Sequence, residues 1–320
     1  MNLNIEYDEG DRLFLMALSQ NLNEPLKIGL LEKAVIEHNN ILSALVLANL
    51  HYSGIEHNGK QLLSQNREKA AEIYVRMKEF DPYGVCYWEL GWLYENQLIN
   101  AAKLLSRFEC LSKAHEYYEK SAEKGYAKAY NSLGKFAFYG YGGATKSFTS
   151  AMEYYIKAAS LGDIYAIMNC GHINMKRYYD NPNRKESLEE AEKYFIKAAL
   201  YNNSEGFLQL GIIHEIKMAD DKKHLTKAKE YYIKAFIAVE NQYGATAYYK
   251  LGKLINNNVD LIKDNDIIIA LGDRRYQDLS IECFTRSYEI FQTLELNHGR
   301  LDGMYRECYM ELIEIFKNIS

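Results

Sequence analysis

The sequence of 320 residues predicts an all-α fold, a solenoid of antiparallel helical hairpins. Two short motifs recur in step along the chain with a period of about 40 residues, which is typical of helical repeat arrays. The chain also contains only three prolines. Because an interior proline removes a backbone donor and clashes with the preceding turn, their scarcity permits long uninterrupted helices.

The first motif is an alanine followed by aromatic residues, a basic residue and further small residues. Its five copies begin 44, 37, 40 and 37 residues apart, at Ala70, Ala114, Ala151, Ala191 and Ala228. In the copy AMEYYIKAA, the alanine, the second aromatic residue and the next small residue stand at i, i+4 and i+7. This spacing places them on one face of a helix, which we name helix B.

The second motif is a small residue followed four residues later by Leu-Gly or a close equivalent. Its glycines are 43, 37, 40 and 41 residues apart, at Gly91, Gly134, Gly171, Gly211 and Gly252. A glycine in mid-helix costs roughly 1 kcal/mol relative to alanine. Its recurrence predicts that a neighbouring helix crosses close to the backbone there. We name this segment helix A and expect the aromatic ring of helix B to fill the space beside the glycine.

Together the motifs resemble the Sel-like repeat, a relative of the tetratricopeptide repeat. The resemblance covers roughly residues 40 to 290, and residues 120–127 and 157–162 carry it most closely. It implies a right-handed superhelix of antiparallel hairpins that serves as an adaptor or scaffold. The sequence departs from the family pattern where the loop glycines after helix A are replaced by Arg177, Lys217 and Val259.

The ends of the array are also interpretable, and we expect one continuous solenoid domain. Residues 1–40 are expected to form a degenerate hairpin, whose second helix starts at Asn23 and Pro25 because proline suits the first helical turn. Residues 41–290 hold about six repeats, with an Asn/Asp-rich insertion at 256–277 that favours turns. Residues 291–320 are expected to form a C-terminal capping helix over the last open core face.

Composition narrows the class of protein. A net charge of −5 argues against nucleic-acid binding, which needs a concentrated basic face. The five cysteines form no CxxC pair and are expected to be reduced core residues. We expect no cofactor, no metal and no membrane span. The polar start is unlike a signal peptide, so we expect a soluble protein of the cytoplasm, or of the host cytoplasm if the source is a virus or pathogen.

No catalytic motif stands out, and the sequence predicts a non-enzymatic scaffold that binds a protein or peptide. The glycine-rich stretch at 140–143 follows a predicted helix, whereas a phosphate-binding loop follows a strand. Two alternatives stay open. One is a regulator of an enzyme complex, or a hydrolase-like member that lacks the regularly paired cysteines of such proteins. The other is a structural protein that assembles end to end, although we expect a monomer or weak self-association.

The candidate contact residues come from the resemblance, because the A helices of tetratricopeptide-like arrays line the concave face. The positions two before, one before and two after the leucine of Leu-Gly point inward, and they include Glu89. With one further lysine, the predicted contacts are Trp88, Trp92, Lys128, Asn131, Lys135, Asn169, His172, Tyr249, Lys250 and Lys253. The tryptophans would be apolar anchors, and the lysines would attract an acidic segment or a carboxyl terminus. Alternatively, the tryptophans pack between neighbouring A helices and the lysines are solvated surface.

Overall fold

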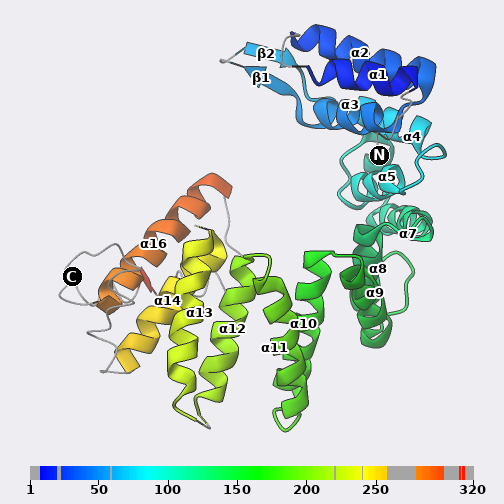
Figure 1. Cartoon of the computed structure of the whole chain (residues 1–320). Coiled ribbons are helices and arrows are strands. Elements are labelled where there is room, and N and C mark those ends of the chain that lie inside the picture. Colours follow the sequence, from blue (N-terminus) through cyan, green and yellow to red (C-terminus); the bar gives the residue numbers. More distant parts are fainter. Residues whose placement is uncertain are drawn as a thin grey trace, which may run out of the picture. The chain divides into compact units, whose positions relative to one another are not determined.

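The structure, a computed structural model, describes residues 8–19, 23–57, 60–219, 221–239, 241–257, 279–298, 310, 312 and 313. The chain divides into two compact units, an N-terminal unit (Met1–Ala166) and a C-terminal unit (Ile167–Ser320). In both, helices follow one another as antiparallel neighbours (Figure 1). Beyond Asn257, the expected insertion lies outside the described residues, as does most of the expected capping segment.

The N-terminal unit consists of helical hairpins and one small β-ribbon. Its elements are α1 (Glu9–Ala17), α2 (Glu24–His38), α3 (Ile41–Ser53), β1 (Ile55–His57), β2 (Lys60–Leu63), α4 (Arg67–Met77), α5 (Val85–Glu95), α6 (Asn100–Lys103), α7 (Arg107–Glu123), α8 (Ala127–Tyr139) and α9 (Phe148–Ser160). The side chain of Asn23 caps α2 by accepting from the Leu26 amide at 3.1 Å, which confirms the predicted start. The antiparallel β1–β2 ribbon was not predicted.

The C-terminal unit continues the alternation of helices. Its elements are α10 (Ile164–Asp180), whose first turn belongs to the N-terminal unit, α11 (Lys185–Ala199), α12 (Ser204–Lys217), α13 (His224–Ala238), α14 (Gln242–Asn257) and α16 (Leu279–His298). Helix A of successive repeats corresponds to α3, α5, α8, α10, α12 and α14, and helix B to α4, α7, α9, α11, α13 and α16. Leu312 is buried in a cluster with Tyr249 of α14 and Phe291 of α16.

The core of each hairpin is organised around the helix-A glycine. A Cβ atom added at any of the five glycines would lie within 2.7 Å of a ring atom on helix B; the pairs are Gly91 with Tyr118, Gly134 with Tyr155, Gly171 with Phe195, Gly211 with Tyr232 and Gly252 with Phe284. All five rings are buried. Both expectations for these glycines are therefore confirmed: the missing side chain lets the next helix approach, and the ring occupies the space.

Candidate functional site

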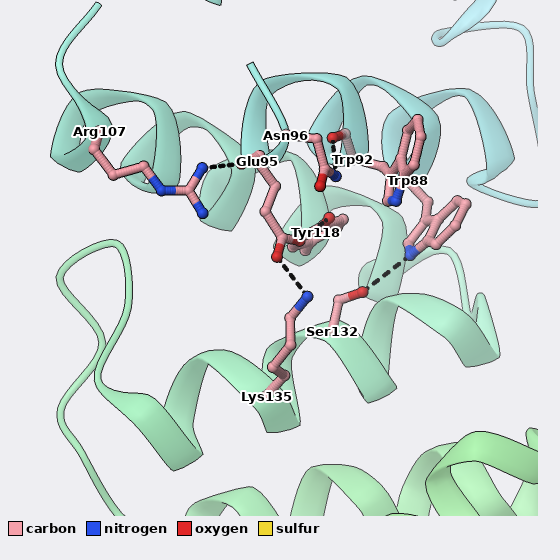
Figure 2. A network of polar contacts seen from close by, with 8 residues as sticks. All are labelled: Trp88, Trp92, Glu95, Asn96, Arg107, Tyr118, Ser132 and Lys135. Atoms are coloured by element: carbon pink, nitrogen blue, oxygen red, sulfur yellow. Dashed lines mark hydrogen bonds and ion pairs between the residues drawn. The ribbon is translucent and has the colours of Figure 1, made fainter. Parts of the chain in front are cut away.

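One side of α5 carries the two tryptophans. Before the helix, the Asp81 carboxylate accepts from the Tyr83 amide at 2.8 Å and from the Cys86 amide at 2.7 Å, which fixes the start of α5. Leu90 is buried toward the core. Trp88 and Trp92, four residues apart, are both half-buried on the other side of the helix. Figure 2 shows both indole rings on the same side of α5.

Trp88 is held in place by α8 and the residue before it. Its indole N–H donates to the Ser132 hydroxyl at 3.0 Å. The ring of Tyr126 meets the indole edge-on, with ring centroids 6.0 Å apart. The Lys128 ammonium group lies over the same indole, 5.1 Å from its centroid, in a cation–π contact. Trp88 is therefore fixed in orientation while part of its ring stays accessible.

Trp92 contacts the preceding repeat. Its ring lies edge-on to Tyr52 of α3, with centroids 5.6 Å apart. Tyr52 in turn has the Arg67 guanidinium over its ring at 5.4 Å. Two rings of this region thus have a cation over the ring: Lys128 lies over Trp88, and Arg67 lies over Tyr52.

A buried polar network lies behind this face (Figure 2). The Glu95 carboxylate, with a side chain only 10% exposed, accepts from the Tyr118 hydroxyl at 2.7 Å and from the Lys135 ammonium group. Arg107 donates to the backbone carbonyl of Glu95. Burial, and then the nearby Glu95 charge, raises the pKa of Tyr118. Since these residues come from α5, α7 and α8, the network ties three helices together.

A similar network occurs in the C-terminal unit. The Glu215 carboxylate accepts from the Tyr232 hydroxyl and lies 3.6 Å from the Lys250 ammonium group. In both networks the glutamate stands four residues after the helix-A glycine, the tyrosine is the second aromatic residue of helix B, and the lysine comes from the next helix A. A glutamate four residues after the helix-A glycine could therefore have indicated these networks from the sequence, but the two repeat motifs defined above do not include it.

The remaining predicted residues lie on three A helices. Asn131 on α8 and Asn169 on α10 are half-buried. On α10, the His172 ring lies 2.9 Å from a Glu205 carboxylate oxygen. On α14, Tyr249 is 3% exposed and belongs to the core, and Lys253 donates to its hydroxyl at 3.0 Å.

The structure therefore gathers one group of predicted residues on α5 and α8 of the N-terminal unit, namely Trp88, Trp92, Lys128, Asn131 and Lys135. The others belong to α10 and α14 in the C-terminal unit. The counting rule treats all A helices alike, but the position two before the leucine is half-buried in α5 and fully buried in α14. Burial at this position depends on how each helix packs, which spacing alone does not encode.

Two carboxyl groups also lie within electrostatic range of Lys128. Burial raises the pKa of Glu89 on α5 and of Asp163 just before α10, and Lys128 opposes the shift in both. Asp163 was not predicted, although its place before a helix is a capping signal: it accepts from the Ala166 amide at 2.7 Å.

Two observations concern the possible metal ligands and the thiols in the described part of the chain. There, no group of three or more His, Cys, Asp or Glu side chains is arranged to hold a metal ion. Cys86, Cys110, Cys170 and Cys283 are buried thiols rather than members of disulfides. Burial raises the pKa of Cys170 to about 12, so its thiol is protonated and unreactive at neutral pH.

Two further sequence features can be placed. The glycine-rich stretch at 140–143 lies in the loop between α8 and α9, as predicted. Among the helices that the structure describes, none combines the length and apolar character needed to cross a membrane.

Comparisons with known proteins identify the fold. No protein-family model matches the sequence, and no curated protein matches it. A solved structure from uropathogenic Escherichia coli, a protective antigen described as displaying an SLR fold, is similar over 95% of this chain, with a TM-score of 0.63 and 22% identity. The chain spans 56% of the length of that protein. A Sel1 repeat protein from Oxalobacter formigenes is similar over 67% of this chain and 79% of its own, with a TM-score of 0.50 and 22% identity. The chain thus has the Sel1-like repeat fold, an all-α array of helical hairpins.

Proposed function

We propose that the chain is a non-enzymatic interaction scaffold that binds a segment of another protein on the α5–α8 face, the surface that carries Trp88, Trp92, Lys128 and Asn131. The observation that carries this proposal is the pair of half-buried indole rings on one side of α5 (Figure 2). They are the two tryptophans of a 320-residue chain. Partly accessible tryptophans in a fixed setting are typical of binding hot spots.

The α5–α8 face favours binding because its side chains are already held in place before a partner docks. The hydrogen bond to Ser132 holds Trp88, and the Glu95 network connects the helices behind it. A preorganised surface loses less side-chain entropy when a partner docks. The fold supports the same interpretation, since helical repeat arrays offer extended surfaces to partners.

An acidic partner segment, the expectation from the lysines, receives less support. Lys135 and Lys250 already face Glu95 and Glu215, so a partner's carboxylate would compete with an existing ion pair. Lys128 remains exposed on the α5–α8 face. The hydrolase-like alternative receives no support from the described cysteines, which are buried thiols outside disulfides.

The proposal is tested with a partner isolated by affinity capture from the source cell and identified by mass spectrometry. Trp92→Ala should weaken binding of that partner by at least about ten-fold, as expected for a hot-spot tryptophan. The matched control is Ile156→Ala, which removes an apolar side chain that is 46% exposed on α9. Both variants should keep the helical circular-dichroism signal. Normal binding by Trp92→Ala together with a loss in Ile156→Ala would refute the proposed face.

A further inference from the structure

Glu89 differs from the other acidic side chains around the α5–α8 face. Glu95, on the same helix, is held by Tyr118 and Lys135. Glu89 is half-buried, yet no hydrogen bond or ion pair joins its carboxylate to any residue that the structure describes. A desolvated carboxylate that no hydrogen bond or ion pair compensates costs folding free energy. Proteins tend to retain such costs at functional sites, where a ligand completes the missing contact.

The aromatic faces beside Glu89 already accept cations. Glu89 directly follows Trp88 and precedes Trp92 by about one helical turn, and all three side chains are half-buried. The chain's own Lys128 lies over the Trp88 ring at 5.1 Å. The contact of Lys128 with Trp88 shows that an aromatic ring of this surface can bind an ammonium group.

The other carboxyl groups near this face have direct partners. Asp81 and Asp163 are both satisfied by backbone amides. Lys128 opposes the raised pKa of Glu89, but it makes no hydrogen bond or ion pair with that carboxylate within the described residues. The hydroxyl of Tyr126, whose pKa is raised to about 12 mainly by burial, is neutral, and the buried Tyr74 hydroxyl and Cys86 thiol also have raised pKa values. The Glu89 carboxylate is therefore the acidic group of this face that still lacks a direct partner among the described residues.

We propose that the α5–α8 face recognises a basic side chain, a lysine or arginine of the partner segment, which pairs with the Glu89 carboxylate beside the Trp88 and Trp92 rings. The inference rests on the proposed function, because it names the chemistry that the same surface selects. An acidic side chain would instead approach the Glu89 carboxylate, which repels it, with Lys128 to attract it. Charge complementarity thus favours a basic segment over an acidic one.

The test uses the full chain and three defined peptides. The peptides are acetyl-Leu-Lys-Leu-amide, acetyl-Leu-Gln-Leu-amide and acetyl-Leu-Glu-Leu-amide, which differ in charge at the central residue. Because both tryptophans of the chain lie on this face, tryptophan fluorescence reports binding there directly. The lysine peptide should bind at least about ten-fold more tightly than the glutamine peptide, as expected for a charge-assisted hydrogen bond. Added salt should reduce this preference.

Variants separate the inference from the proposed function. Glu89→Gln should weaken the lysine peptide by about ten-fold and leave the glutamine peptide unchanged. Glu153→Gln, on an exposed position of α9, is the matched control and should change neither. No binding of any peptide, equal binding of the lysine and glutamine peptides, tighter binding of the glutamate peptide, or a preference that survives Glu89→Gln would each overturn the inference. The proposed function is judged separately, by the effect of Trp92→Ala on the captured partner.

Discussion

The substitution Gly134→Ala should destabilise the protein even though alanine is the better helix former. The new Cβ would lie 2.6 Å from Cε1 and 2.7 Å from Cδ1 of Tyr155. That ring is 4% exposed and has little room to move. Overpacking of this kind costs about 1–3 kcal/mol, and the gain in helix propensity offsets about 1 kcal/mol. The net effect should be a loss of about 1 kcal/mol in the free energy of unfolding.

Gly29 provides the matched control. It also lies within a helix, α2, but it is exposed and an added Cβ would meet nothing within 4 Å. Gly29→Ala should therefore stabilise by up to about 1 kcal/mol. Urea unfolding followed by circular dichroism measures both variants. In a Tyr155→Leu background, Gly134→Ala should change from destabilising to stabilising. If Gly134→Ala stabilises the native background as much as Gly29→Ala does, the assigned packing is wrong.

Three further predictions concern single side chains. Glu89→Gln should leave the melting temperature unchanged or raise it, since it removes a half-buried charge that lacks an ion pair; a clear drop would show that the carboxylate is structural. Glu95→Gln should lower the free energy of unfolding by about 1–3 kcal/mol in urea titrations, because both Tyr118 and Lys135 bind this carboxylate. Unchanged stability would contradict the network. Burial lowers the pKa of His214 from 6.5 to about 4. In the unfolded chain this histidine takes up a proton near pH 6.5, while in the folded protein it stays neutral until about pH 4. The free energy of unfolding should therefore have its full value above pH 6.5 and decline as the pH falls toward 4. His214→Gln should flatten this decline, and an identical slope in both proteins would count against it.

The hairpin core could be predicted from the sequence because both of its partners repeat. Gly134 and Tyr155 each belong to a motif that recurs with the same period, so their contact follows from the register of the two helices. Within the described residues the β1–β2 ribbon occurs once, between α3 and α4. Periodicity cannot predict a segment that does not repeat.

The polar contacts of the site were harder to predict. The Glu95 network joins side chains from three helices, and its lysine comes from the next repeat. Whether Trp88 reaches Ser132 depends on how α5 is rotated relative to α8, and residue spacing does not specify that rotation. The tryptophans of α5 could thus be selected from the sequence. The ion pair between Lys135 and Glu95, and the lack of an ion pair at Glu89 among the described residues, became visible only in the folded structure.

A partner that docks on the tryptophan face of α5 should change the surroundings of both indole rings. Since the chain has two tryptophans, the indole N–H region of a two-dimensional NMR spectrum should contain two signals, one from Trp88 and one from Trp92. The direct measurement is this spectrum before and after saturation with the captured partner. We predict that both indole signals shift on binding. A saturated complex in which neither signal moves would contradict the assignment of the binding face.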